Sequence, residues 1–190
     1  MELPEGPKVA RASGYDTAMA DGSHPAGLPI DELLRACEAE RFRASGPGGQ
    51  HRNKVETAVR LTHRPTGVTG QASERRSQAQ NHAVALFRLR VNLALSVRVP
   101  ASETSQIVAS ERWRSRTKGG RLASNPGHDD FPALLAEALD ALAGFGDDVS
   151  AAAKALGVSG SQMVKLLRHE PRAIELVNTR RSEAGLSRLR

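Results

Sequence analysis

A run of glycine and proline in the first third of the chain constrains its fold more than any other feature. The segment Gly46-Pro47-Gly48-Gly49-Gln50 cannot form the interior of a helix or a strand, because glycine is conformationally free and proline lacks an amide hydrogen. Charged and less polar residues alternate over residues 40–45, before this run, and again over residues 57–62, after it. The sequence therefore predicts two strands joined by a glycine-rich loop.

The residues that follow predict a hairpin and then a long helix. Pro65-Thr66-Gly67 has the composition of a turn between residues 57–62 and 68–72. Residues 77–95 read as an amphipathic helix capped by Ser77, and we expect its apolar stripe to contain Ala83, Val84, Phe87, Val91 and Ala94. A short helix ahead of the first strand is expected to carry Ile30, Leu33, Leu34 and Cys37 on its apolar side. Together these elements predict an α+β domain over residues 28–100.

The remaining segments differ from this domain in composition. Residues 1–27 are rich in Gly, Pro, Asp, Ala and Ser and are predicted to form a disordered arm. Residues 101–130 are predicted to form a basic linker, and residues 131–190 a small all-α domain. Within the latter, residues 152–167 resemble a helix–turn–helix with Gly157 at the turn and Ser159 or Ser161 as the second cap. Docking and RNA contact remain open for this domain, and DNA reading is the least favoured role.

Positive charge is concentrated in the middle of the chain. Residues 35–128 carry 17 basic and six acidic side chains, whereas the whole chain has a net charge of +6. Such a block is typical of proteins that bind a polyphosphate. The alternative is a solvated basic surface without a partner.

Other features exclude several classes of protein. The single cysteine, Cys37, cannot form an intrachain disulfide, and we expect it to lie in the core. No apolar run approaches the ~20 residues that span a bilayer, and the N-terminus does not resemble a secretory signal. The six histidines are scattered without the spacing of metal ligands. We therefore expect a cytoplasmic protein that uses no metal, cofactor or membrane.

The glycine-rich loop carries the most specific chemistry. Gln50 offers amide donors and an acceptor, but it does not titrate near neutral pH and so cannot be a general base. A Gly-Gly-Gln loop can instead position backbone N–H groups and a side-chain amide around an ester or a water. Alone, the tripeptide is common, and a simple surface turn is the competing interpretation.

A longer pattern surrounds the tripeptide and resembles the catalytic domain of class I peptide chain release factors. The matching stretches are Arg43-Ala44-Ser45-Gly46-Pro47-Gly48-Gly49-Gln50-His51-Arg52-Asn53-Lys54, residues 58–63, Pro65-Thr66-Gly67, Glu74-Arg75-Arg76-Ser77-Gln78 and Asn81. The resemblance covers about residues 28–98. It is closer still to the short, codon-independent relatives that rescue stalled ribosomes. Departures are Arg52, where the family has a small apolar residue, and a less apolar strand over residues 67–72.

The resemblance implies a function and its residues. It predicts that Gly48, Gly49 and Gln50 enter the peptidyl-transferase centre and hydrolyse the ester of peptidyl-tRNA, with the ribosome supplying the rest of the site. Gln50 is also the candidate for N-methylation by a glutamine methyltransferase. Only about 28 residues precede the domain, so we expect no codon reader and predict codon-independent release.

Several basic and polar residues are candidates for RNA contact. Some flank the loop or start the long helix, and others lie in the basic linker: Arg43, His51, Arg52, Asn53, Lys54, Arg75, Arg76, Arg112, Trp113, Arg114, Arg116 and Lys118. His51 is equally suited to supporting the backbone, and Trp113 to packing. The alternative function is a non-catalytic RNA- or DNA-binding protein that uses the basic segment and the helix–turn–helix.

Overall fold

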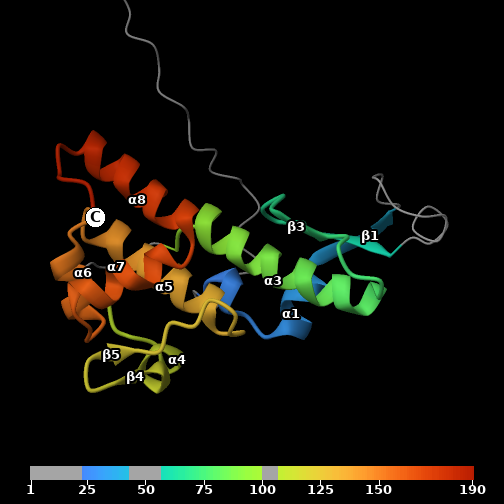
Figure 1. Cartoon of the computed structure of the whole chain (residues 1–190), viewed down its shortest axis with the longest axis horizontal. Coiled ribbons are helices and arrows are strands. Elements are labelled where there is room, and N and C mark those ends of the chain that lie inside the picture. Colours follow the sequence, from blue (N-terminus) through green and yellow to red (C-terminus); the bar gives the residue numbers. More distant parts are fainter. Residues whose placement is uncertain (1–22, 43–56, 100–106) are drawn as a thin grey trace, which may run out of the picture.

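An antiparallel sheet forms one end of the molecule (Figure 1). The computed structural model describes residues 23–42, 57–99 and 107–190. β1 (Cys37–Phe42), β2 (Ala58–His63) and β3 (Thr69–Ala72) pair in that order. Phe42 lies opposite Ala58, so the segment between β1 and β2 is anchored at two adjacent strand ends. The predicted strand pair and hairpin are confirmed, although β1 begins at Cys37 and not at Glu40.

The short helix before the sheet ends earlier than expected. α1 (Ile30–Arg35) stops before Cys37, which is the first residue of β1 and is half-buried. Leu33 is fully buried, but Ile30 is 48% exposed, so the predicted stripe is wrong at both of its ends. The physical reason is that the helix has only six residues, fewer than two turns, so its stripe is short and Cys37 already belongs to β1.

The long helix α3 (Gln78–Ser96) is confirmed, with Ser77 at its N-cap, but the face that it buries differs from the predicted stripe. Val91 and Ala94 of the predicted stripe are buried, Val84 and Phe87 are half-buried against the core, and Ala83 is exposed. The buried positions follow an i, i+4 spacing through Asn81, Ala85, Leu89 and Leu93, with further buried residues at Leu86, Arg90, Val91 and Ala94. α3 is buried from two directions, because it packs against β2 and β3 on one side and against α5 (Phe131–Gly144) on another.

Gly70 explains why the second strand of the hairpin is less apolar than its family resemblance suggests. A Cβ atom at this position would lie 2.3 Å from the carbonyl oxygen of Ala85 and 2.3 Å from the amide nitrogen of Leu89, both in α3. Backbone atoms cannot rotate away as a side chain can. Glycine therefore lets β3 approach the helix backbone closely.

We expect Gly70→Ala to destabilise the protein by about 3 kcal/mol, because the helix and the strand must separate to admit a methyl group. Chemical denaturation of the wild-type protein and of Gly70→Ala measures this effect. Gly127→Ala is the matched control, since a Cβ there would meet only the Asn125 side chain at 3.6 Å. Equal stability of the two variants would contradict the close approach.

The expected linker is folded in the part that the structure describes. α4 (Glu111–Arg116) leads into a small hairpin of β4 (Thr117–Lys118) and β5 (Arg121–Leu122). Trp113 of α4 is fully buried, and its indole nitrogen donates a hydrogen bond to the carbonyl oxygen of Leu156 at 2.8 Å. A residue that we predicted as an RNA contact therefore belongs to the core and ties α4 to the helical end.

The end of the expected N-terminal arm is also ordered from residue 23 onward. Pro25–Gly27 form a 3-10 helix, η2, and Ala26 is fully buried. The His24 ring accepts a hydrogen bond from the Ala26 amide at 3.0 Å, and its other nitrogen lies 3.2 Å from the carbonyl oxygen of Val97. Burial lowers the pKa of His24 to about 4, with a further contribution from the charge of Arg98, so the ring is neutral. Residues 1–22 lie outside the described part of the chain.

Four helices build the other end of the molecule: α5, α6 (Val149–Ala155), α7 (Gly160–Arg168) and α8 (Pro171–Glu183). The α+β class is confirmed. Buried apolar side chains from the sheet, α3 and these helices form one continuous core. Arg90, buried in α3, donates hydrogen bonds to the carbonyl oxygens of Ala26 and Asp129 and so joins the two ends. No helix within the described ranges is long and apolar enough to cross a bilayer.

A tight turn joins α6 to α7. Gly157 has a φ of 68°, a conformation that glycine adopts at little cost, and Ser159 caps α7 by accepting a hydrogen bond from the Gln162 amide. Ala153, Leu156, Val158 and Leu167 are buried, whereas Val164 is only half-buried and Met163 takes an inner position. Whether this pair of helices binds nucleic acid stays a prediction.

Candidate functional site

The predicted catalytic loop lies between the paired ends of β1 and β2. Its residues Gly48, Gly49 and Gln50 fall outside the residues that the structure describes. The same holds for five candidate RNA contacts, which are Arg43, His51, Arg52, Asn53 and Lys54. Their roles stay predictions, but both anchors of the loop, Phe42 and Ala58, are described and form a cross-strand pair.

Asn81 holds the base of this loop in place. Its side chain is fully buried at the start of α3. The amide nitrogen donates to the carbonyl oxygens of Thr57, at 2.7 Å, and of Arg75, at 2.9 Å. The amide oxygen accepts from the Arg75 backbone at 2.9 Å. One side chain therefore connects the residue preceding β2 to the segment that enters α3.

The sequence pattern contained Asn81 but did not give it a role. A signal was present, because a lone asparagine stands at the first position of the i, i+4 series that α3 buries. A fully buried polar side chain in such a series requires hydrogen-bond partners, and those partners lie at the base of the loop.

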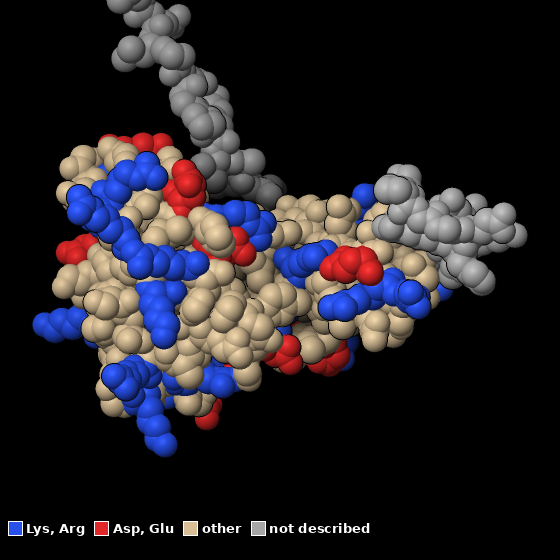
Figure 2. Space-filling view, viewed as in Figure 1, with Lys and Arg blue, Asp and Glu red and all other residues tan. Residues whose placement is uncertain are grey.

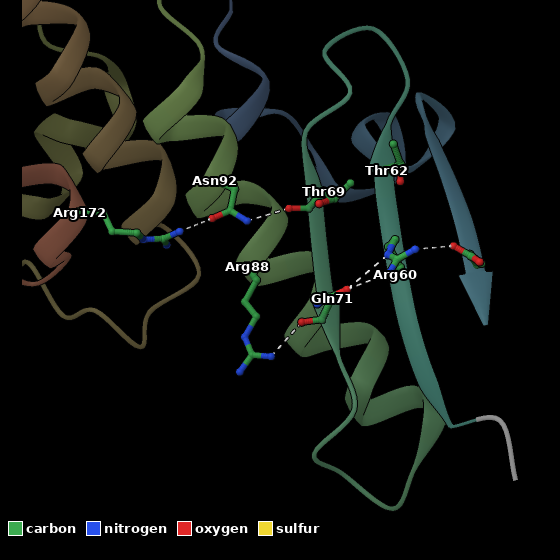
Figure 3. Close-up of a pocket in the computed structure, with 8 residues that line it drawn as sticks. Arg60, Thr62, Thr69, Gln71, Arg88, Asn92 and Arg172 are labelled. Atoms are coloured by element: carbon green, nitrogen blue, oxygen red, sulfur yellow. Dashed lines mark hydrogen bonds and ion pairs between the residues drawn. The ribbon is translucent and has the colours of Figure 1, made fainter. Parts of the chain in front are cut away.

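The face of the sheet away from α3 is open and lined by polar side chains. Figure 3 shows a groove there, of about 770 Å³. Arg60 donates hydrogen bonds to the Gln71 side chain at 3.3 Å, and its guanidinium lies 5.2 Å from the centre of the Phe42 ring. At the other edge, Arg172 of α8 contacts Asn92, which donates to the carbonyl oxygen of Thr69. The groove thus joins the sheet to the helical end.

The arginines of this groove are paired with carboxylates. Arg60 lies 3.1 Å from Glu40, Arg88 lies 2.7 Å from Glu74, and Arg172 lies 2.7 Å from Glu170. The pKa of Glu74 is lowered by hydrogen bonds from its own amide and that of Ser73, and then by Arg88. Figure 2 shows the consequence, since basic and acidic side chains lie side by side over the sheet. This groove offers little uncompensated positive charge.

The basic segment around α4 divides into paired and exposed residues. The guanidinium of Arg116 lies 2.8 Å from Asp130. Arg112 lies 3.4 Å from the same carboxylate and donates a hydrogen bond to the carbonyl oxygen of Gly27 at 2.9 Å. These two arginines, predicted as RNA contacts, are held within the fold because a carboxylate lies beside them. Arg114 and Lys118 are exposed, as are Arg75 and Arg76 before α3.

This division predicts that two pairs of substitutions differ in their effect on the free energy of unfolding. Arg112→Ala with Arg116→Ala should lower the free energy of unfolding by roughly 1–2 kcal/mol, because Asp130 and the Gly27 carbonyl oxygen lose charged partners. Arg114→Ala with Lys118→Ala should change it by less than about 0.5 kcal/mol, because both side chains are exposed. Thermal denaturation compares the pairs, and equal losses in both would contradict the assignment.

Titratable groups near the sheet do not suggest acid–base chemistry. Burial lowers the pKa of His63, whose ring lies 2.8 Å from the Thr66 hydroxyl inside the hairpin turn. Burial raises the pKa of the Cys37 thiol, which opposes thiolate formation. Across the described ranges, no three His, Cys, Asp or Glu residues are grouped to hold a metal ion. What the site shows is a means of positioning a loop.

Comparison with known proteins assigns the family. Residues 32–125, about half of the chain, match the model of the RF-1 domain. The chain belongs to the class I release factor family. The matched range contains the sheet, the glycine-rich loop, α3, α4 and the small hairpin, and the domain boundary at residue 100 stays a prediction.

Several of the curated proteins that resemble this chain are peptide chain release factors. The chain is 52% identical over 61 residues to "Peptide chain release factor 1" of Acidiphilium cryptum, which covers 32% of this chain and 17% of that protein. It is 43% identical over 86 residues to "Peptide chain release factor 1" of Nitrosomonas eutropha, or 45% of this chain and 21% of that protein. With "Peptide chain release factor 2" of Variovorax paradoxus it shares 57% identity over 54 residues, or 28% of this chain and 15% of that protein. The chain thus spans about a fifth of the length of the curated relatives that it matches.

Proposed function

We propose that this protein binds the ribosome and hydrolyses the ester of peptidyl-tRNA with the loop Gly48-Gly49-Gln50. The observation that carries the proposal is the RF-1 match over residues 32–125, which contain this loop. The described frame supports it, because β1, β2 and the Asn81 hydrogen bonds give the loop two fixed anchors. The named relatives are release factors 1 and 2.

In this proposal the protein acts by positioning groups and takes up no proton. Gly48 and Gly49 give the backbone room to approach the ester, and the Gln50 amide groups orient the attacking water and stabilise the developing charge. The rest of the site comes from ribosomal RNA. Gln50 is also the proposed site of N-methylation by a glutamine methyltransferase, and the cytoplasm, where ribosomes work, is the proposed location.

Basic and polar residues of the RF-1 domain are proposed to contact ribosomal RNA. Arg75 and Arg76 stand just before α3, in the segment that Asn81 ties to the loop base. Arg43, His51, Arg52, Asn53 and Lys54 flank the catalytic tripeptide in sequence. Arg114 and Lys118 are exposed on α4 and β4. Arg112, Arg116 and Trp113 are not included, because each has an intramolecular partner.

We further propose that release does not depend on a stop codon, because the motif around the loop most resembles that of the short, codon-independent relatives that rescue stalled ribosomes. Ribosomes carrying labelled peptidyl-tRNA would be prepared with a stop codon, a sense codon or no codon in the decoding site. Comparable release rates in all three are expected. Release confined to the stop-codon complex would contradict codon independence but not hydrolysis, and no release in any complex would contradict the proposed function itself.

A further inference from the structure

A second groove lies at the helical end of the molecule, along α7. It has a volume of about 390 Å³, its apolar lining includes Val149 and Val164, and its charged lining consists of Lys165, Arg168 and Arg190. None of the described residues that line it carries a carboxylate side chain. α6 and α7 lie at the opposite end of the molecule from β1 and the anchors of the catalytic loop (Figure 1).

The charged side chains of this groove have no carboxylate partner among the described residues. Among the described residues, none of the three cations has an ion pair or a hydrogen bond from its side chain, and all three are exposed. The sheet groove differs in this respect, because Arg60, Arg88 and Arg172 each face a carboxylate. Three like charges beside one hollow repel one another and attract a polyanion.

We propose that the α7 groove binds the phosphate backbone of RNA and gives the protein a second contact on the ribosome, remote from the catalytic loop. The choice of RNA rests on the proposed function. The side chains themselves favour phosphate contact, since the exposed positions of α7 carry Ser161, Lys165 and Arg168. Gln162, the amide on this helix that could read a base edge, is half-buried.

Two pairs of substitutions remove equal charge from the helical end. The groove pair, Lys165→Ala with Arg168→Ala, removes two of the three cations that line the groove. Lys154→Ala with Arg188→Ala removes two exposed cations that do not line it. All four side chains are exposed, so thermal denaturation should show both variants folded like the wild type. Each full-length variant would be titrated with a labelled single-stranded RNA of 20 nucleotides at several salt concentrations, and with a DNA duplex of the same sequence.

The groove pair should weaken RNA binding by roughly tenfold at about 0.15 M salt and reduce the slope of log Kd against log salt by about 1.4, for two phosphate contacts. The control pair should bind like the wild type. Equal losses of affinity in both pairs would mean that the overall charge, and not the groove, determines RNA binding. No loss of affinity in either pair would mean that α7 does not bind RNA. Tighter binding to the DNA duplex than to RNA would overturn the choice of nucleic acid.

The titration contains no ester, so its outcome is independent of catalysis. Loss of RNA binding in the groove pair, with a wild-type protein that releases no peptide, would support the groove and contradict the proposed function. Peptide release by the wild-type protein, together with unchanged RNA binding in the groove pair, would support the proposed function and contradict the groove.

Discussion

Replacing Gln50 by alanine is expected to slow release of peptide from stalled ribosomes by about 10²–10³-fold, while the Kd for the ribosome changes little. The loss corresponds to the removal of one positioned donor in an acyl-transfer site. Affinity should persist, because a single uncharged side chain contributes little beside the phosphate contacts of a basic surface. Single-turnover release of labelled peptide and sedimentation of the protein with ribosomes measure the two quantities.

Gln80→Ala is the matched control for this substitution. Gln80 is an exposed glutamine of α3, so its replacement removes the same functional group away from the loop. We expect release at the wild-type rate. Full activity of Gln50→Ala would mean that Gln50 does not take part in hydrolysis. An equal loss of activity in both variants would mean that the loss does not arise from the loop.

Replacing Asn81 by alanine is expected to destabilise the protein by about 3 kcal/mol and to slow release as well. The substitution removes a fully buried side chain and leaves the partly buried Thr57 carbonyl oxygen and the Arg75 amide and carbonyl oxygen without their hydrogen-bond partner. It also frees the residue preceding β2 from the start of α3, so the loop loses a fixed anchor. Urea denaturation gives the stability, and release at a temperature where the variant is folded gives the second effect.

Asn92→Ala provides the comparison on the same helix. Asn92 makes a hydrogen bond to Thr69 and one with Arg172, but it is only half-buried, so water can replace both partners. Its loss should cost about 1 kcal/mol and leave release unchanged. If the two asparagine variants had the same stability and the same release rate, Asn81 would not be the residue that positions the loop.

Local sequence patterns predicted the strands, the hairpin and the long helix around the site. They did not fully predict which face of α3 is buried, because that depends on tertiary packing. Strand alternation and turn composition gave the β1–β2 pair and the hairpin, because both signals lie within a few residues. The buried face of α3 was predicted only in part, because Val91 and Ala94 are buried but Ala83 is exposed. α3 is covered by the sheet and also by α5, so apolar residues occur around much of its circumference and several stripes fit the sequence. Which stripe faces the sheet depends on Gly70, where the two backbones meet.

The basic segment shows a second limit of sequence reasoning. A run of arginines predicts phosphate binding equally well whether or not a carboxylate folds back on it. Asp130 lies 14 residues after Arg116 and pairs with it, which no local pattern indicated. Conversely, Lys165 and Arg168 lie three residues apart on α7, so helical spacing alone places them on one face. Only the tertiary fold brings Arg190 to the same groove.

Hydrolysis itself is tested most directly by tracing oxygen from water into the product. Ribosomes holding peptidyl-tRNA without a stop codon would be treated with the wild-type protein in water enriched in ¹⁸O, and the released peptide would be weighed by mass spectrometry. We predict one ¹⁸O atom in the new terminal carboxylate, deacylated tRNA as the second product, and loss of both with Gln50→Ala. Intact peptidyl-tRNA after saturating wild-type protein, both without a stop codon and with one, or a released peptide without ¹⁸O, would contradict the proposal that this loop directs water to the ester.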